Sequence, residues 1–266
     1  LNMKICIYGA GAIGGYLGAK LTEIGADVTL IARGPHYNAI KEDGLRLRKD
    51  GKELVVYPRC VDTAEKAGKQ DYIFVTLKAH SVPGCLDAFK VLMKDDTSFV
   101  WGVNGIPWWY FHNHSDPEFK DKKILSVDPD NSQWNDIGPE KIIGCIVNPA
   151  SEVIKPGVIQ HLEGDKFQLG KINGENTDRI KNLSEILEKA GFQVIASTSF
   201  ISFLVPFMWL SRQRLNKKPA SSQGELQPPA WLNLCFWSVM QLEIIFLKLG
   251  VRLPVGGSLI LVAQKP

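Results

Sequence analysis

The chain has 266 residues, of which 45% are hydrophobic and 22% are charged, and its formal net charge is +3. This length accommodates two domains, and the composition is that of an ordinary soluble globular protein. The slight and scattered positive charge suits an anionic small molecule and argues against a nucleic-acid-binding surface. The sequence therefore predicts small-molecule chemistry with no nucleic-acid partner.

The five cysteines are widely spaced and include no C-x-x-C pair. They indicate buried thiols of a reducing compartment rather than a disulfide framework or a zinc site. We expect no signal peptide before the first strand. The most apolar segments, 200–210 and 231–249, are too short or too polar to span a bilayer. These features predict a cytoplasmic protein with no membrane partner and no bound metal.

The N-terminal stretch KICIYGAGAIGG, residues 4–15, has the pattern of a strand, a glycine-rich turn and a helix. Lys4–Tyr8 is a short apolar run, which predicts a buried parallel strand. Gly9, Gly11 and Gly14 follow at the G-x-G-x-x-G spacing, which permits a tight turn, the close approach of a pyrophosphate and close helix–strand packing. The unpaired N–H groups at the start of the following helix are suited to bind a diphosphate. The alternative is a turn whose glycines serve packing only.

The second predicted strand, Asp27–Ile31, ends close to Arg33. An NAD-preferring site usually carries an acidic residue about 20 residues beyond the glycines, where it binds the ribose 2′-hydroxyl. Arg33 instead suits a 2′-phosphate, to which it can donate charge-assisted hydrogen bonds. We therefore predict NADP(H) as the cofactor, the alternative being a solvated surface arginine.

Two further predicted strands each deliver a polar residue at their carboxyl end. Tyr72–Leu77 precedes Lys78, and Ser98–Val103 precedes Asn104. Ligands of open α/β sheets bind outside these ends, so we predict that both side chains lie within reach of one ligand. Asn104 offers a donor and an acceptor that can hold a carbonyl or a hydroxyl group. A generic strand-end lysine and an Asn-Gly turn are the alternatives.

The rest of the N-terminal part predicts a hairpin, further strands and a helix. Residues 45–57 predict a hairpin about Asp50-Gly51, in which Leu47 lies opposite Leu54. The remaining predicted elements are strands at Ile142–Val147, Val158–His161 and Phe192–Ala196, and a helix that begins after Asn176 or Thr177 and ends at Gly191. We place the end of the N-terminal domain at residue 196.

Together, these motifs resemble the ketopantoate reductase family. The matching pieces are MKICIYGAGAIGGYLGAKL at the start, VTLKAHSV around Lys78, VNGI around Asn104, NPASEVIKPGVIQH across Ala150, and LEKAGFQVIAS up to Ser197. The resemblance is close over residues 3–197. It implies an α/β fold in which a Rossmann-type NADP-binding domain, residues 1–196, precedes a smaller, mostly helical C-terminal domain, residues 197–266, which is incomplete.

By position, the resemblance assigns cofactor binding to Gly9, Ala10, Gly11, Ala12, Ile13, Gly14, Arg33, Lys78, Asn104 and Ala150. It also makes Asn104 a catalytic residue, where nicotinamide and substrate meet. The implied reaction is hydride transfer from NADPH to C2 of a small anionic 2-oxo acid, foremost 2-dehydropantoate in pantothenate biosynthesis. The sequence leaves the oligomeric state undecided, a homodimer being one option.

Past Ser197 the resemblance breaks. The family continues with a tryptophan, a catalytic lysine two residues later and an asparagine four residues after that, whereas here Trp209 is followed by Ser211 and Leu215 at those positions. The general-acid lysine is therefore not found where it is expected, and residues 198–237 are expected not to encode the catalytic helices in their proper reading. The alternatives to an NADPH-dependent reductase are a catalytically impaired NADP(H)-binding protein on the same scaffold and another Rossmann hydroxyacid dehydrogenase.

Overall fold

The structure is a computed structural model that describes residues 3–114, 116–171, 177–194, 197–200 and 258–261. Contacts within the chain define two compact units, residues 1–195 with 265–266, and residues 196–264. In the second unit, the described residues form one antiparallel pair of strands, β13 (Ser197–Phe200) and β14 (Ser258–Leu261). The candidate site lies in the first unit.

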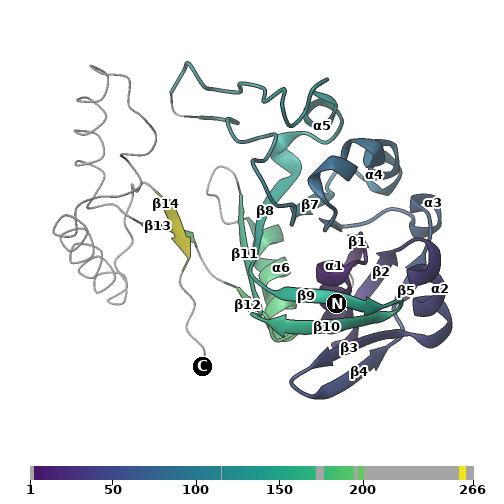
Figure 1. Cartoon of the computed structure of the whole chain (residues 1–266). Coiled ribbons are helices and arrows are strands. Elements are labelled where there is room, and N and C mark those ends of the chain that lie inside the picture. Colours follow the sequence, from purple (N-terminus) through teal and green to yellow (C-terminus); the bar gives the residue numbers. More distant parts are fainter. Residues whose placement is uncertain (1–2, 115, 172–176, 195–196, 201–257, 262–266) are drawn as a thin grey trace, which may run out of the picture. The chain divides into compact units, whose positions relative to one another are not determined.

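An eight-stranded sheet forms the centre of the first unit (Figure 1). From one edge to the other, its strands are β12 (Gln193–Val194), β11 (Lys166–Lys171), β8 (Ile142–Val147), β7 (Ser98–Trp101), β6 (Tyr72–Val75), β1 (Lys4–Tyr8), β2 (Asp27–Ile31) and β5 (Arg59–Val61). The strands from β8 to β5 are parallel, and β11 and β12 run in the opposite direction. Strand order changes direction beside β1, as in a doubly wound dinucleotide-binding sheet. The predicted α/β, Rossmann-type fold is confirmed.

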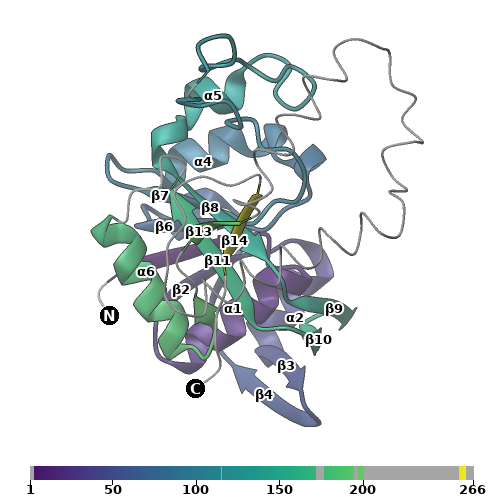
Figure 2. The same ribbon diagram turned by 90° about the vertical axis from the view of Figure 1, so that its left-hand side faces the viewer.

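Both faces of this sheet are buried. Ile5 and Ile7 of β1 pack into one apolar core, and Cys6 between them packs into another on the opposite face. The first core includes residues of α1 and α6, and the second includes residues of α3 and α4. Since both faces are covered, the strands read as continuous apolar runs. The α-helices among the described residues are α1 (Ala12–Glu23), α2 (Gly34–Asp43), α3 (Ala64–Ala67), α4 (Leu86–Leu92), α5 (Ser132–Asp136) and α6 (Asp178–Lys189). Helix α6 lies alongside β11 (Figure 2) and also contacts β12.

A smaller sheet covers the side of α1 that faces away from the main sheet. Its strands, in order, are β4 (Lys52–Val56), β3 (Leu45–Lys49), β10 (Val158–Glu163) and β9 (Ala150–Lys155). Glycines let α1 approach both sheets closely, because a Cβ atom at Gly18 would lie 2.6 Å from Leu30 of β2 and one at Gly15 would lie 2.7 Å from Ile159 of β10. The helix is therefore apolar nearly all round, as expected for an enclosed helix.

The predicted hairpin is confirmed with its register. Leu47 pairs with Leu54, and Asp50 and Gly51 form the turn with φ angles of +50° and +73°. Positive φ at both central residues is what a two-residue type I′ turn requires. Leu45, Leu47, Leu54 and Val56 accordingly lie on one face, and the exposed Val55 lies on the other.

Two predicted strands end earlier than expected. The strand before Lys78 stops at Val75 instead of Leu77, and the strand before Asn104 stops at Trp101 instead of Val103. The reason is the neighbouring β1, which ends at the level of Val75 and turns into the glycine-rich loop, so the following residues have no strand to pair with. Within the described residues, the predicted strand at residues 192–196 is represented by β12, and β10 extends to residue 163.

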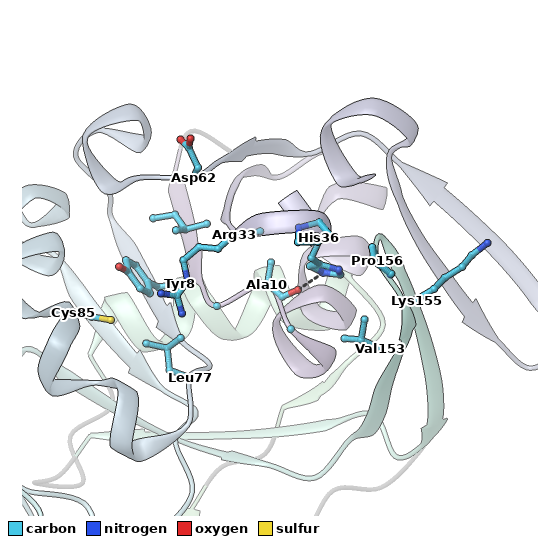
Figure 3. A pocket seen from close by; sticks show the side chains of 15 residues that line it. Tyr8, Ala10, Arg33, His36, Asp62, Leu77, Cys85, Val153, Lys155 and Pro156 are labelled. Carbon is cyan, nitrogen blue, oxygen red and sulfur yellow. Dashed lines mark hydrogen bonds between the residues drawn. The ribbon is translucent and has the colours of Figure 1, made fainter. Parts of the chain in front are cut away.

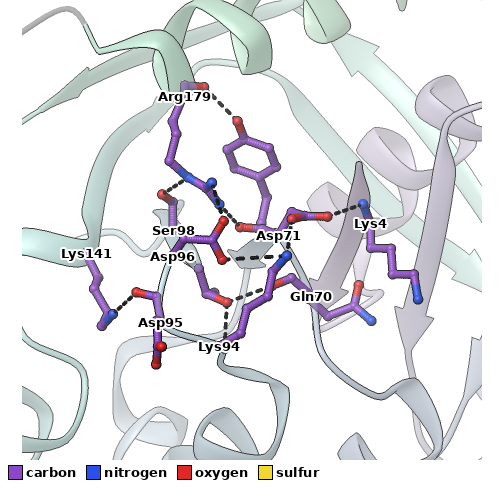
Figure 4. A network of polar contacts seen from close by, with 11 residues as sticks. Lys4, Gln70, Asp71, Lys94, Asp95, Asp96, Ser98, Lys141 and Arg179 are labelled. Atoms are coloured by element: carbon purple, nitrogen blue, oxygen red, sulfur yellow. Dashed lines mark hydrogen bonds and ion pairs between the residues drawn. The ribbon is translucent and has the colours of Figure 1, made fainter. Parts of the chain in front are cut away.

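A polar network closes the amino edge of the main sheet (Figure 4). The carboxylate of Asp71, just before β6, accepts a hydrogen bond from the Lys4 N–H at 2.8 Å and pairs with Lys94 Nζ at 2.5 Å. Arg179 of α6 pairs with Asp96 at 3.1 Å and donates to Ser98 Oγ at 3.0 Å. Partial burial acts to raise the pKa of Asp71, but hydrogen bonds from Lys94 and Lys4 outweigh it, so the pKa of this carboxyl is lowered.

Within the described part of the chain, no helix is long and apolar enough to cross a membrane. The cysteines in this part, Cys6, Cys60, Cys85 and Cys145, are free thiols.

Candidate functional site

The carboxyl ends of four parallel strands lie at one level of the main sheet. Tyr8 of β1 pairs with Ile31 of β2 and with Val75 of β6, and Val75 pairs with Trp101 of β7. The residues that follow these ends therefore leave the sheet at one edge, and they are Gly9, Arg33, Lys78 and Asn104. Lys78 and Asn104 occupy equivalent positions, each three residues past its strand, so the structure brings both to the edge where ligands of such sheets bind.

The glycine-rich loop between β1 and α1 is held by the surrounding backbone. Gly9 has a φ angle of +106°, a conformation that favours glycine. The N–H groups of Gly9 and Ala10 donate to the Ile31 carbonyl at 3.3 and 3.2 Å, and Thr76 Oγ1 donates to the Gly9 carbonyl at 2.8 Å. A Cβ atom at Gly14 would lie 2.2 Å from that same carbonyl oxygen. Gly14 is therefore required for close packing of α1 on the loop.

The start of α1 leaves four backbone donors without a partner among the described residues. The first hydrogen bond of the helix runs from the Gly15 N–H to the Gly11 carbonyl at 2.7 Å, so the N–H groups of residues 11–14 precede it. No side chain caps this helix, and its first turn carries no acidic residue. Gly11 faces open space, since a Cβ atom there would meet nothing within 4 Å. This combination of unpaired donors, positive dipole end and accessible backbone fits a diphosphate.

A cavity of about 600 Å³ lies beside this loop (Figure 3). Its lining residues are Tyr8, Gly9, Ala10, Gly11, Ile31, Ala32, Arg33, Pro35, His36, Asp62, Leu77, Cys85, Val153, Lys155 and Pro156. This volume falls within the range of cofactor and small-molecule sites. Of the predicted cofactor residues, the cavity brings together Gly9, Ala10, Gly11 and Arg33.

The charges around the cavity favour an anion. Arg33 is exposed and directs its side chain towards Tyr8, whereas Lys155 directs its ammonium group away from the cavity (Figure 3). The single carboxylate among the lining residues, Asp62, pairs with Lys66 at 2.7 Å. Burial raises the pKa of Tyr8, which keeps its phenol neutral beside Arg33. Arg33 is therefore available to a ligand, as a 2′-phosphate site requires.

His36, on the first turn of α2, connects the loop to the smaller sheet and was not identified from the sequence. Its Nε2 lies 2.7 Å from the Ala10 carbonyl oxygen, and its Nδ1 accepts the Gly157 N–H at 3.0 Å. Burial lowers the pKa of His36, although the hydrogen bond with Ala10 acts in the opposite direction. No sequence signal pointed to this side chain, because Gly157 is 121 residues away.

A second cavity, of about 390 Å³, is lined by Ala79, the residue after Lys78, and by Asn104. Leu77 lines the first cavity and Ala79 lines the second, so the exposed Lys78 lies between the two. The second cavity is lined mainly by apolar residues, and its members are Ala79, His80, Val82, Pro83, Trp101, Val103, Asn104, Gly105, Ile106, Pro107, Trp108, Ser126, Val127, Pro129 and Gln133.

Aromatic packing fixes one wall of this second cavity. Trp108 is 1% exposed, and its ring meets those of Trp101, Trp109 and Trp134 edge to face at centroid distances of 6.0, 5.0 and 5.9 Å. Such pairs stabilise a core beyond the area that they bury. Asn104 is therefore an exposed polar group beside a rigid apolar wall.

The other predicted residues do not line either cavity. Ala12, Ile13 and Gly14 form the first turn of α1 and follow Gly11, the last residue of the loop that lines the first cavity. Ala150 begins β9 and pairs with Glu163 in the smaller sheet. The predicted disruption at residues 198–237 lies outside the described residues except for 198–200. Among the described residues, no group of three or more histidine, cysteine or carboxylate side chains could hold a metal ion.

Comparison with known proteins places these features in one family. A family model described as ketopantoate reductase PanE/ApbA matches residues 5–174. A 2-dehydropantoate 2-reductase of Mesorhizobium japonicum is 40% identical over 258 residues, which cover 96% of this chain and 79% of that protein. This alignment extends beyond residue 197, where the resemblance read from the motifs ends.

Solved structures show the same fold. A protein of Ralstonia solanacearum described as a ketopantoate reductase has a TM-score of 0.68 and 32% identity, covering 72% of this chain. This chain spans 59% of that protein, less than two thirds of its length. A D-mandelate dehydrogenase solved with NADH and anilino(oxo)acetate has a TM-score of 0.58 at 23% identity, covering 72% of this chain and 56% of its own; it supports the fold alone.

Proposed function

The chain belongs to the ketopantoate reductase family, and from that premise we propose that it binds NADPH and reduces a small anionic 2-oxo acid, with 2-dehydropantoate as the expected substrate. The observation that carries this proposal is the carboxyl edge of the main sheet. There, the unpaired N–H groups of residues 11–14, the guanidinium of Arg33 and the amide of Asn104 follow β1, β2 and β7 of one parallel sheet.

Each part of NADPH has a counterpart among these residues. The N–H groups of residues 11–14 and the dipole of α1 are suited to the diphosphate. Arg33, at the end of β2, is suited to the 2′-phosphate, to which its planar guanidinium can donate two hydrogen bonds. Lys78 lies between the two cavities, where its ammonium group can reach phosphate or substrate. When bound, the cofactor supplies the hydride for the substrate carbonyl carbon.

The chain's own contribution to the chemistry is to orient and polarise the substrate. The Asn104 amide can donate to the oxo group while it accepts from a hydroxyl, and it does so without titrating. The buried Trp108 contributes an apolar surface to the cavity that Asn104 lines. A proton is needed on the oxygen that becomes the hydroxyl, and a positioned general acid contributes typically about 10²–10⁴-fold to such a step.

The sequence supports a second candidate, an NADP(H)-binding protein with little turnover. Ser211 stands at the position where the family resemblance places the general-acid lysine. Ser211 lies outside the described residues, so this candidate rests on sequence alone. We further propose a cytoplasmic location and a role in pantothenate biosynthesis, with a homodimer as the assembly to test.

One pair of measurements separates these candidates. NADPH is titrated into the full chain and followed by quenching of tryptophan fluorescence, and NADPH oxidation is then followed after 2-dehydropantoate is added. Binding with turnover supports the reductase, and binding without turnover supports the impaired protein. A chain that does not bind NADPH contradicts both. A panel of other 2-oxo acids distinguishes ketopantoate reduction from the activity of a different hydroxyacid dehydrogenase.

A further inference from the structure

His36 joins two segments of the cofactor cavity that are far apart in the sequence. It lies in the first turn of α2, contacts Ala10 in the glycine-rich loop and contacts Gly157 in the turn between β9 and β10. Lys155 and Pro156, which precede Gly157, line the same cavity as Ala10 and His36. We name these three residues, Ala10, His36 and Gly157, the His36 clasp.

The hydrogen bonds of the clasp fix the tautomer of the imidazole ring. The Gly157 N–H can only donate, so His36 Nδ1 accepts and carries no proton. The single proton of a neutral ring is then on Nε2, which donates it to the Ala10 carbonyl at 2.7 Å. Both ring nitrogens have a hydrogen-bond partner in this neutral tautomer, and in no other protonation state of the ring do both have one. A proton added to Nδ1 would face the Gly157 N–H, donor against donor.

The bond to Ala10 also fixes the neighbouring peptide N–H. In a trans peptide, the carbonyl group and the following N–H point in opposite directions, and the described residues contain no cis peptide. Anchoring the Ala10 carbonyl on His36 therefore sets the direction of the Gly11 N–H. Gly11 lines the cavity, faces open space and carries one of the unpaired donors suited to a diphosphate.

We infer that His36 is a positioning residue for dinucleotide binding: its neutral Nε2–H form orients the glycine-rich loop and holds the β9–β10 turn against it, and protonation of Nδ1 breaks the bond to Gly157 while the bond to Ala10 remains. This inference rests on the proposed binding of NADPH. It assigns to His36 no contact with the cofactor or substrate. The expected consequence is an affinity for NADPH that falls in mildly acidic solution.

The surroundings of His36 support a neutral ring. The titratable side chains that line the same cavity are Tyr8, Arg33, Asp62, Cys85 and Lys155. Asp62, the one carboxylate among them, is engaged by Lys66, while Arg33 and Lys155 are cationic. The partial burial of the ring lowers the pKa of His36 in the same direction. A histidine whose folded-state pKa is lowered loses stabilisation as the pH falls from its unfolded pKa, near about 6.5, to its folded pKa.

The first test measures NADPH affinity of the full chain between about pH 8 and pH 5.5, across the ordinary titration range of histidine. The wild type is compared with His36→Phe, which loses both bonds, and with His36→Gln, which can donate to Ala10 but cannot also accept from Gly157. His114→Gln, a matched change in the loop at residues 111–121 outside both cavities, is the control. The 2′-phosphate of NADPH itself titrates near about pH 6. Each result is therefore expressed as the ratio of wild-type to variant affinity, which cancels that titration.

At the upper pH, we expect His36→Phe to bind NADPH about tenfold more weakly and His36→Gln about threefold more weakly, in keeping with one or two neutral hydrogen bonds. As the pH falls, the wild type should lose the Gly157 bond, so that the ratio to His36→Gln tends to one and the ratio to His36→Phe decreases but stays above one. His114→Gln should follow the wild type at every pH. A ratio of one throughout, or a ratio that does not change with pH, would overturn the inference.

The second test needs no cofactor and remains decisive if His36→Phe fails to fold or if NADPH does not bind. Long-range ¹⁵N–¹H NMR spectra of the wild type report the tautomer and the pKa of each histidine, and His36→Gln identifies the His36 signals. We expect the Nε2–H tautomer and a pKa below the ordinary value. An Nδ1–H tautomer, or a pKa at or above about 6.5, would refute the clasp. Absence of NADPH binding by the wild type at the upper pH would instead contradict the proposed function.

Discussion

The polar residues at the amino edge of the main sheet, where its parallel strands begin, and those at the carboxyl edge, where these strands end, are in opposite states. At the amino edge, Asp71 forms an ion pair with Lys94, and Arg179 donates a hydrogen bond to the Asp71 carbonyl oxygen (Figure 4). At the carboxyl edge, the side chains of Arg33 and Asn104 form no hydrogen bond or ion pair with any described residue. Polar groups that satisfy one another stabilise a fold, whereas unsatisfied groups at an accessible edge are available to a ligand.

This contrast teaches that a charged residue cannot be assigned to a site by its position at a strand end alone. Asp71 precedes β6 and Lys78 follows it, and only the direction of the strand distinguishes them. The comparison can be tested by substitutions that should change either stability or affinity, and in one case both.

The largest effect is expected at Gly14, where the loop and α1 meet. Gly14→Ala places a Cβ atom 2.2 Å from the Gly9 carbonyl oxygen, so the helix must shift. Overpacking of this kind costs about 1–3 kcal/mol of folding stability, and NADPH binding should be lost as well. Thermal unfolding and NADPH titration measure the two losses.

Gly11→Ala is the matched control, since a Cβ atom at Gly11 meets nothing within 4 Å and the φ angle of −69° is ordinary. It should leave the free energy of unfolding unchanged and weaken NADPH binding, because the added methyl group occupies space in front of the loop. Equal stability losses in the two variants would remove the distinction between packing and binding glycines.

The next effect is expected from Arg33→Asp at the carboxyl edge. A charge-assisted bond contributes about 1.5–3 kcal/mol, so NADPH affinity should fall about 10–100-fold, whereas NADH affinity should change little. Stability should be unaffected, because Arg33 is exposed and unpaired among the described side chains. Equal losses of affinity for NADPH and NADH in parallel titrations would contradict the assignment of NADP(H).

A smaller effect, on folding stability and not on NADPH affinity, is expected from Asp71→Asn at the amino edge. The side chain of Asp71 is 17% exposed and engages Lys94 and the Lys4 N–H, so its loss should cost about 1–3 kcal/mol of stability. NADPH affinity should be retained. A clear loss of affinity without a loss of stability would reverse the roles given to the two edges.

The same variant has a pH signature. The folded-state pKa of Asp71 is lowered, so its carboxylate contributes stability above the unfolded pKa and loses it as the pH falls through the folded pKa. Acid unfolding of Asp71→Asn should therefore be less steep than that of the wild type below about pH 4.

The smallest effect is expected from Asp62→Asn. Asp62 is the one carboxylate lining the first cavity, but it is solvated and paired with Lys66, so its charge is largely screened from an anion. NADPH affinity should rise less than about twofold, and stability should not change measurably. A large gain in affinity would show that Asp62 faces the cofactor directly.

The parts of the fold that could be predicted are those determined by residues close together in the sequence. Lys4–Tyr8 and Asp27–Ile31 are apolar runs because both faces of their sheet are buried, and Asp50-Gly51 specifies its own turn. By contrast, β9 was missed because residues 152–155 are exposed and show neither an apolar run nor alternation. The glycine-rich loop and Arg33 could be identified for the same local reason, since their spacing is set by one strand and one turn.

The rest of the candidate site depends on contacts between distant residues. The exact ends of β6 and β7 are set by where β1 stops, and not by the residues after them. Ala150 matched a family motif yet lies in the smaller sheet, outside both cavities. His36 carries no motif at all, because its role arises only when the smaller sheet closes over α1.

The His36 clasp has a consequence for biosynthesis on the ribosome. The loop containing Ala10 leaves the ribosome early, but Gly157 follows His36 by 121 residues. At a synthesis rate of about 5–20 residues per second, this delay is roughly 6–24 seconds. During that interval β3 lacks its parallel partner β10, and α1 lacks the part of its cover that β9 and β10 supply. We therefore expect the nascent chain to need protection from aggregation until β10 has emerged, and the loop to gain its final geometry only then.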